Sequence, residues 1–330
     1  MPRAEIHRLD PPAVLPGGRL VVTGSGFQVQ PGHLPEVSLG GERGRIVRAS
    51  PRQLVVEVPA GTAGGRLPLS IEGLEGATPL VAVGSMVTTG VHQVDGPVYD
   101  AQGRLYATLS GQRGQQTPVS VYRIGLDGAR EPFVTGLGNA TSLAFGPDRQ
   151  LYVSSRFEGT VSRVNAAGEV EKFAEGLGVA FGLAFNRAGD LFVGDRSGTI
   201  HRVDADGHAT TFATLPPSVA AFHLAMGPDD TLAVAAPTLN SADNLYRVSP
   251  SGEVTRWMDG FGRPQGLAFD AHGVLHVVDA LAGDSGVYRV SSDGQRTLVV
   301  SGAGLIGVTF DPTDGAMAVC TDDTIYRIPA

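Results

Sequence analysis

The feature of this sequence that most restricts its fold is a unit that recurs six times at intervals of 40 to 46 residues. Each unit opens with a short apolar run that ends in an aromatic residue or methionine. These end residues are Tyr99, Phe145, Phe185, Met226, Phe269 and Phe310. A period near 40 residues is typical of β-propellers, whose blades stack because none can bury its apolar faces alone.

The units contain four apolar runs each, apart from the last, and polar turns rich in aspartate and glycine separate the runs. In the first unit the runs read GPVY, LYAT, VYRI and PFVTG, and the turns include Asp100 to Gly103 and Asp127-Gly128. Short runs joined by such turns indicate antiparallel β-hairpins. We therefore predict a six-bladed β-propeller with four-stranded blades.

Closure of the ring needs one more strand, because the last unit reaches Ala330 after only three runs. The apolar segment Val83 to Val91 precedes the first unit and is the natural donor of this strand. We predict that this N-terminal strand completes the last blade, and that deleting residues 85–91 destabilises the whole propeller.

Residues 4–82 show none of the repeat, but they alternate β-rich runs such as RLVVTGSGF and QLVVEVP with Pro/Gly turns, which predicts a small sandwich. The order of Asp10-Pro11-Pro12, Val21 to Phe27, Val37 to Gly41 and Leu54 to Gly61 resembles the IPT/TIG family of immunoglobulin-like domains. The resemblance implies a module for interaction or spacing. We thus expect an all-β chain with an immunoglobulin-like β-sandwich at 1–82 and the propeller at 83–330.

Composition excludes several classes of function. The net charge is −8, from 33 acidic and 25 basic residues, which argues against a nucleic-acid partner. Cys320 is the single cysteine, so the chain can form no internal disulfide. The sequence shows neither a secretory signal nor the ~20-residue apolar run of a membrane helix. We expect no membrane partner and a cytoplasmic protein, or a secreted one if a signal peptide has been removed.

The six units also serve as controls for one another. Each has an arginine in its third run, so we predict that this residue is structural. The six arginines are Arg123, Arg163, Arg202, Arg247, Arg289 and Arg327. The turn aspartates recur in the same way, and we expect them to bind local backbone groups.

Departures from the repeat are more informative at the start of each first strand. In propellers, this position and the loop between the second and third strands converge on the channel mouth. The residues before the first-strand glycine are Asp95, Thr141, Phe181, Phe222, Gln265 and Ile306, and Ser142 and His223 replace the glycine in the second and fourth units. The loops add Arg156, Asp195, Arg196 and Asp279.

Asp95 and His223 are the candidate catalytic residues, provided that they lie within about 3 Å of each other or one water apart. The candidate ligand-binding residues are Thr141, Arg156, Phe181, Asp195, Arg196, Phe222, Gln265 and Asp279. For each residue taken singly, a structural role or a solvated surface position is the alternative interpretation.

Residues 92–330 contain the string GPVYDAQGRLY and repeats of the form GLAF followed by LFVGD. In these strings the region resembles two related groups of propellers. One is the NHL-repeat proteins, and the other is the family of gluconolactonase, senescence marker protein and luciferin-regenerating enzyme. The family implies a lactonase or esterase with a divalent cation, Ca²⁺, Mg²⁺, Mn²⁺ or Zn²⁺, whose first ligand corresponds to Asp95. Its other ligands fall near Ala180 or Phe181, Phe222 and Gln265. Virginiamycin B lyases are also propellers that this region resembles. The position of the histidine characteristic of those lyases falls at Gln265 and Phe222 in this sequence, rather than at His223.

Three functions follow from these observations. The leading hypothesis is a binding scaffold that recognises a small molecule or a protein at the channel mouth, with the N-terminal domain as spacer or second contact. The alternative is a hydrolase or lyase with a diverged site, in which Asp95 acts as metal ligand or base and His223 as its acid/base partner. A structural part of a larger assembly is the third.

Overall fold

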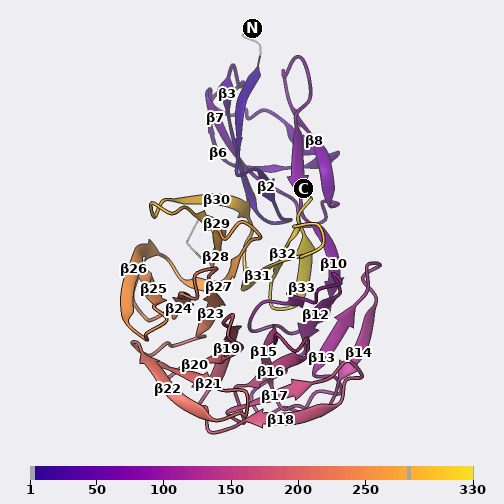
Figure 1. The fold of residues 1–330 in the computed structure, drawn as a ribbon. Coiled ribbons are helices and arrows are strands. Elements are labelled where there is room, and N and C mark those ends of the chain that lie inside the picture. The colour runs from indigo at the N-terminus through magenta and orange to yellow at the C-terminus, as the bar shows by residue number, and fades with distance from the viewer. Residues whose placement is uncertain (1–3, 281–283, 330) are drawn as a thin grey trace.

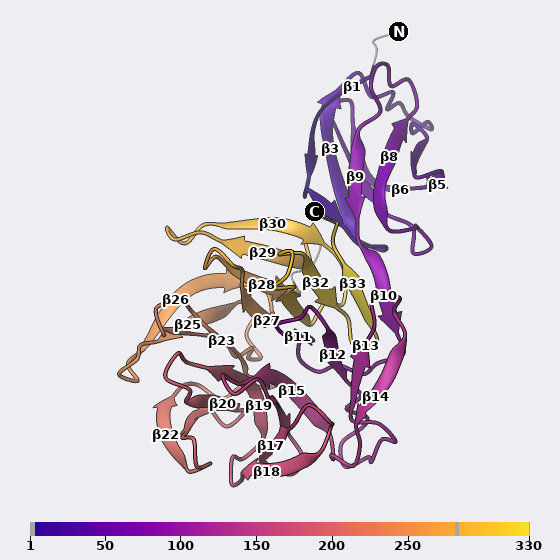
Figure 2. The same ribbon diagram turned by 45° about the vertical axis from the view of Figure 1, so that its right-hand side comes forward.

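The computed structural model describes residues 4–280 and 284–329, and the secondary structure assigned there is entirely β. Two parts are evident in Figures 1 and 2. We call them the N-terminal region (residues 4–83) and the repeat region (residues 85–329). Among the described residues, no helix is long and apolar enough to cross a membrane.

The repeat region is built from four-stranded antiparallel sheets in which neighbouring strands follow one another along the chain. The first two sheets are β11 (Val98–Tyr99), β12 (Leu105–Thr108), β13 (Val121–Ile124) and β14 (Arg130–Val134), and β15 (Ala140–Phe145), β16 (Leu151–Ser155), β17 (Thr160–Val164) and β18 (Val170–Ala174). The next two are β19 (Ala180–Phe185), β20 (Leu191–Asp195), β21 (Thr199–Val203) and β22 (Ala209–Thr214), and β23 (His223–Met226), β24 (Leu232–Ala235), β25 (Asp243–Val248) and β26 (Val254–Phe261). They are followed by β27 (Pro264–Phe269), β28 (Leu275–Asp279), β29 (Gly286–Val290) and β30 (Arg296–Ser301).

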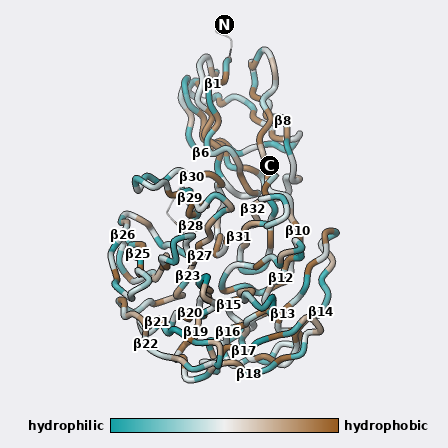
Figure 3. Tube along the Cα trace, viewed as in Figure 1, coloured by the Kyte–Doolittle hydropathy of each residue, from teal (hydrophilic) through white to brown (hydrophobic). Residues whose placement is uncertain are grey.

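The first strands of these sheets lie next to one another around a central axis (Figure 2). Contacts run from β11 to β15, β19, β23, β27 and β31 (Gly307–Phe310), and β31 returns to β11. Apolar side chains of adjacent sheets fill the space between them, as Leu183 and Leu191 do beside Tyr152. Hydrophobic residues accordingly recur along the strands in Figure 3, while the connecting turns are largely hydrophilic.

The last sheet joins the two ends of the repeat region. β10 (Ser85–Thr89) pairs antiparallel with β33 (Thr324–Arg327), and β32 (Met317–Cys320) and β31 complete the order β10-β33-β32-β31. The hydroxyls of Thr89 and Thr324 lie 2.9 Å apart across this pair. Strands distant in sequence therefore close the circle of sheets through hydrogen bonds.

The N-terminal region consists of two facing groups of strands. One is the sheet of β1 (Glu5–Asp10), β3 (Arg19–Ser25), β7 (Gln53–Glu57) and β6 (Arg45–Ser50), and the other contains β5 (Glu42–Arg43), β4 (Val37–Leu39), β8 (Gly65–Ile71), β9 (Leu80–Val83) and β2 (Ala13–Val14). Leu20 and Leu54 from the first group pack with Leu69 and Val81 from the second in one buried cluster. The region thus has a hydrophobic core of its own.

A continuous sheet links the two regions. β2 pairs in parallel with β9 on one side and with β30 on the other, so the strands of the second group continue into β27-β28-β29-β30. Gly84 is the single residue between β9 and β10, and a Cβ there would lie 2.3 Å from Leu15 Cδ2. A larger residue at this junction would have to displace the Leu15 side chain, which packs closely against Gly84.

The structure confirms the roles predicted from recurrence. Arg123 and Arg163 pair with Glu131 and Glu171 across their own sheets, with N to O distances of 2.7 Å in both cases. Asp100 accepts hydrogen bonds from the backbone amides of Gln102 and Arg104, at 3.0 and 2.9 Å. These side chains are therefore part of the architecture.

Candidate functional site

Two predicted catalytic residues meet at the starts of the first strands. His223 Nδ1 lies 2.8 Å from Asp95 Oδ1, although their strands belong to sheets on different sides of the circle. His223 is the first residue of β23, and Asp95 precedes β11. Gly182 and Gly266 occupy the equivalent positions of the neighbouring sheets, where a Cβ would lie 2.5 Å from the carbonyl oxygen of Phe222 and 2.7 Å from that of Ile306, so glycine lets the first strands approach closely.

The imidazole of His223 is almost fully enclosed, since its side chain is 1% exposed. Its second nitrogen, Nε2, lies 3.3 Å from Gln265 Oε1. The ring of Phe181 stands edge-on to it, with centroids 6.2 Å apart. Both ring nitrogens thus face protein acceptors, and the imidazole fills the centre of the ring of first strands.

The charge state of Asp95 is fixed by its surroundings. Burial would raise the pKa of this carboxyl group, but the charge of His223 and hydrogen bonds from His223, Ser142 and the backbone amide of Gly96 lower it below its ordinary value. The Gly96 amide lies 2.8 Å from Asp95 Oδ1. Asp95 is therefore a carboxylate at neutral pH whose oxygens are largely engaged.

A cavity of about 260 Å³ begins at Asp95 and Ser142 and runs along the first strands. Leu183, Leu224 and Leu267 are among the apolar side chains that line it. The cavity shares Phe185, Met226 and Phe269 with a 450 Å³ hollow among the turns that follow the first strands. The channel is thus hollow on this side of Asp95.

Several predicted ligand-binding residues are buried and serve the backbone. Asp195 accepts hydrogen bonds from the amide of Val179 at 2.8 Å, and Asp279 accepts them from the amides of Gly262 and Arg263 at 3.0 and 2.7 Å. These carboxylates hold the segments that lead into β19 and β27. The geometry therefore gives both carboxylates a part in fixing these segments.

Two more of these predicted residues are enclosed. Thr141 is 1% exposed, and its hydroxyl donates to the carbonyl of Asn139 at 2.7 Å. Phe222 is fully buried, and its ring packs against Gly194 of the adjacent sheet. Neither side chain lies open to a ligand at the mouth.

Arginines gather where the loops surround the starts of the first strands. The backbone amide of Arg156 donates to Thr141 Oγ1 at 3.2 Å, and Arg156 Nη2 reaches the carbonyl of Gly111 at 3.3 Å. Arg196 Nη2 donates to the carbonyl of Val219 at 3.1 Å. Burial, and then the charges of Arg196 and Arg113, lower the pKa of Arg156 from its ordinary value. We call Arg113, Arg156 and Arg196 the mouth arginines.

The mouth arginines have no carboxylate partner among the described residues. The ion pairs between arginine and carboxylate groups in the described part of the chain involve other arginines. The Nε atoms of Arg156 and Arg196 are buried and have no hydrogen-bond partner there. Guanidinium groups in this state can bind carboxylate or phosphate groups.

Sequence reasoning missed residues that the structure places near this site. Ser142 was noticed only as a replaced glycine, yet it hydrogen-bonds to Asp95. Gln93 is 1% exposed, and both polar atoms of its amide lack a protein partner. Arg113 lies in the loop between β12 and β13, and the sequence pattern alone does not distinguish it from other loop residues. A polar residue beside a predicted channel was the only available signal for Gln93.

The residues present around Asp95 do not fit a divalent cation. Its Oδ1 atom is engaged by His223 and Gly96. At the other implied positions Phe181 and Phe222 offer no ligand atom, and the side-chain oxygen of Gln265 faces His223 Nε2 at 3.3 Å. A hard cation takes six or more oxygen ligands. Among the described residues, the side chains close enough to share an ion are Asp204, Asp206 and His208, exposed in the turn before β22.

Comparisons with known proteins point to the fold. No family model and no curated protein matches this chain. A gluconolactonase structure from Xanthomonas campestris is similar at 17% identity and a TM-score of 0.60, over 74% of this chain and 88% of that one. Virginiamycin B lyase from Staphylococcus aureus is similar at 16% identity and 0.54, over 73% and 95%. This chain contains a β-propeller.

A third similarity extends over both regions. An auxiliary nutrient binding protein from Bacteroides ovatus matches at 14% identity and a TM-score of 0.57, covering 99% of this chain and 98% of that one. At these identities the likeness shows the fold alone, so the function must be argued from the residues of the site.

Proposed function

We propose that the circle of sheets is a six-bladed propeller closed by β10, and that residues 1–82 form an immunoglobulin-like sandwich of the IPT/TIG kind. Support comes from the return contact of β31 with β11 and from the pairing of β10 with β33. The two facing groups of strands around one core support the sandwich. The division at residues 82 and 83 agrees with the change of sheet around Gly84.

The proposed function is that of a binding scaffold. A small molecule or a protein partner is recognised at the channel mouth, and the N-terminal domain serves as spacer or second contact. One observation carries this proposal: Arg156 and Arg196 present guanidinium groups without carboxylate partners beside the channel. Both ring nitrogens of His223 are engaged within the protein, by Asp95 and Gln265, which favours binding over catalysis.

Replacing both Arg156 and Arg196 with glutamine is expected to weaken binding of an anionic ligand by about tenfold or more, because two charge-assisted hydrogen bonds are lost. The measurement is a thermal-shift screen of sugar acids, dicarboxylates and phosphorylated compounds, followed by calorimetric titration of any hit. Arg256→Gln is the matched control, since Arg256 lies on the outer strand β26. Equal affinity in the double variant and the control would contradict the proposal.

A second candidate function is hydrolysis of a lactone or ester, or a lyase reaction. The specific observation in its favour is the 2.8 Å contact between Asp95 and His223, which meets the distance required of an acid/base pair. In such a reaction Asp95 would hold His223 in place, and the imidazole would move a proton once Gln265 turns away from Nε2.

Metal analysis and a turnover assay together separate the two candidates. Because the residues around Asp95 do not fit a cation, we expect the purified protein to hold no stoichiometric ion, and its melting temperature to be unchanged by EDTA or by added Ca²⁺, Mg²⁺, Mn²⁺ or Zn²⁺. A stoichiometric ion that is lost in Asp95→Ala would instead favour the metal-dependent lactonase. In either case, turnover of a lactone and ester panel that disappears in His223→Gln would show that the pair is catalytic.

A further inference from the structure

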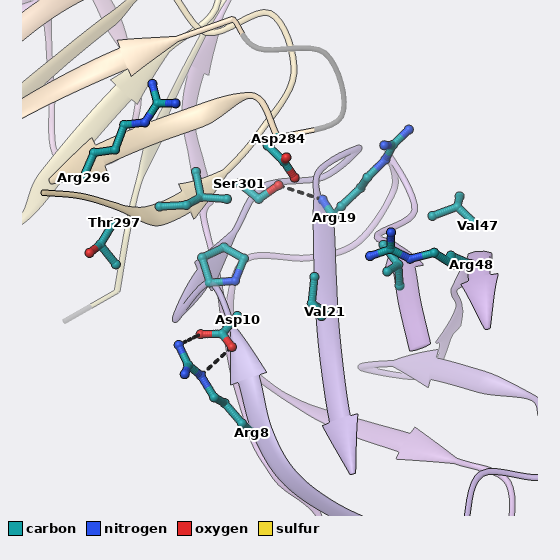
Figure 4. Close-up of a pocket in the computed structure, with 13 residues that line it drawn as sticks. Arg8, Asp10, Arg19, Val21, Val47, Arg48, Asp284, Arg296, Thr297 and Ser301 are labelled. Carbon is teal, nitrogen blue, oxygen red and sulfur yellow. Dashed lines mark hydrogen bonds and ion pairs between the residues drawn. The ribbon is translucent and has the colours of Figure 1, made fainter. Parts of the chain in front are cut away.

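A hollow of about 660 Å³ lies between the N-terminal region and the repeat region, and Figure 4 shows the side chains that line it. Its charged groups do not converge on one point. Arg48 and Arg296 lie at opposite ends of the hollow. Arg8 is neutralised by Asp10, whose Oδ1 accepts a hydrogen bond from Arg8 Nη2 at 2.7 Å. A smaller hollow within the repeat region has a more closely defined set of walls.

The smaller hollow has a volume of about 170 Å³ and lies between the first two sheets of the repeat region. It borders the turn after β11, whereas Asp95 precedes that strand, so it is distinct from the channel mouth. We call it the aromatic pocket, because Tyr106, Phe133 and Phe145 are among the residues that line it. An apolar protein cavity of about 150 Å³ can hold benzene. The volume of the aromatic pocket therefore suits a ligand with a single ring.

The rings of the aromatic pocket are packed against one another. Tyr106 stands edge-on to both phenylalanines, with its centroid 5.1 Å from that of Phe133 and 5.3 Å from that of Phe145. Leu151 and Val164 also line the pocket, and both are buried, as is Tyr106. Aromatic rings attract a further ring that lies edge-on or offset to them. This part of the wall thus favours an aromatic ligand.

Comparison with other units of the repeat shows why the pocket is open between the first two sheets. Pro147 and Pro228, in the turns after β15 and β23, pack against the turn of the following sheet. Their Cγ atoms lie 3.4 Å and 3.0 Å from where a Cβ on Gly189 and on Gly273 would stand. Ala101 holds the equivalent position in the first unit. Its smaller side chain leaves space that proline fills in those two units.

The residue that stands opposite in the second unit is Arg149, and its backbone is unusual. Its φ is +61°, at a turn position where four other units have glycine. A side chain in this conformation costs free energy, and such residues cluster at functional sites. Asp230, the other exception, accepts a hydrogen bond from the amide of Arg187 at 3.1 Å. The guanidinium of Arg149 has no hydrogen-bond or ion-pair partner among the described residues, so no such contact accounts for it.

The other charged groups of the aromatic pocket are paired with each other. Asp100 Oδ2 lies 2.6 Å from Arg104 Nε, which leaves Arg149 as the one unpaired charge in the lining. We propose that the aromatic pocket binds a small aromatic carboxylate, whose ring packs against Tyr106 and its two phenylalanine neighbours and whose carboxylate pairs with Arg149. A single guanidinium matches the single charge of a carboxylate and can donate two parallel hydrogen bonds to it.

Ligand-detected NMR titration of the full chain with phenylacetate, the neutral phenylacetamide and acetate tests the proposal. At low ionic strength we expect phenylacetate to bind, and the other two compounds to bind about tenfold more weakly or not at all. The amide lacks the charge that Arg149 would pair with, and acetate lacks the ring. Absence of phenylacetate binding at about 10 mM would overturn the proposal, as would equal binding of the amide or of acetate.

Variants then locate the site. Arg149→Gly installs the residue found in four other units, so we expect it to remain folded in urea unfolding and to weaken phenylacetate binding by about tenfold. Ala101→Pro, which introduces the residue that fills this space elsewhere, is expected to weaken it as well. Arg256→Gln, a change of charge on the outer strand β26, serves as the control and should leave binding unchanged.

The same variants separate this site from the channel mouth. Equal affinities for phenylacetate in Arg149→Gly and Arg256→Gln would contradict the proposal. Loss of binding in Arg156→Gln with full binding in Arg149→Gly would place the anion at the mouth arginines, which would overturn the proposal and support the proposed function instead.

Discussion

Replacing residues 85–91 with a Gly/Ser linker of the same length is expected to lower the melting temperature of the repeat region by about 10 °C. The replacement removes the strand that covers β33 and the side chain of Val91, which is 4% exposed and packs with Ile325 and Cys320. Losing this burial and these hydrogen bonds costs on the order of 3 to 4 kcal/mol. Differential scanning calorimetry gives the change directly.

A control for this experiment is a Gly/Ser replacement of residues 239–242, which are all exposed in the loop between β24 and β25. It changes the chain without removing a strand, so the melting temperature should stay close to that of the parent. An unchanged melting temperature after replacement of residues 85–91 would mean that β10 does not hold the circle of sheets closed.

Much of the fold follows from short-range patterns in the sequence. The runs LYAT and VYRI became β12 and β13, and the Asp100 turn between β11 and β12 has the backbone hydrogen bonds expected of it. Strand formation and turn chemistry depend on residues a few positions apart, which a repeat displays several times. The parallel pairing of β2 with β30 has no such local signature, because it joins Ala13 to Val300.

The candidate site was predictable in part. Equivalent positions in the repeat placed Asp95, His223 and Gln265 at one end of the channel. The distances between these side chains depend on the width of the circle of first strands, which the sequence does not reveal. Asp195 and Asp279 show that a comparison of equivalent positions in the repeat can also identify structural residues. Ser155 ends β16 as these aspartates end β20 and β28, and its hydroxyl also binds the segment before the first strand of its own sheet, at the carbonyl of Gly138. Comparing the ends of the second strands would have marked all three as structural.

Asp95→Ala is expected to lower the free energy of unfolding at pH 7 by about 3 kcal/mol, the usual result of breaking a buried charged pair. The variant leaves His223 Nδ1 without its partner in an enclosed position, since the histidine is 1% exposed. Asp127→Ala is the matched control, because Asp127 is exposed and its carboxylate accepts a hydrogen bond from the nearby Ala129 amide, at 3.0 Å. We expect it to cost about 0.5 kcal/mol. Urea unfolding of both variants provides the comparison.

Coupling between the two side chains gives a sharper version of this test. If Asp95 and His223 act as a unit, the double variant Asp95→Ala/His223→Leu should be clearly less destabilised than the sum of the single variants. Additive effects would show that the 2.8 Å contact contributes little to stability.

The pH dependence of unfolding follows from the direction of the Asp95 shift. Because folding lowers the pKa of Asp95, the folded state favours the charged carboxylate, and the stabilisation is fully present above the pKa of the unfolded chain, about 3.9. It is lost as the pH falls through the lower pKa of the folded state. The contribution of the Asp95 carboxylate to the difference between the parent and Asp95→Ala should therefore be constant above about pH 5 and should shrink below about pH 4. A difference that grows on acidification would mean that the carboxyl group is protonated in the folded protein, and that burial outweighs the charge of His223.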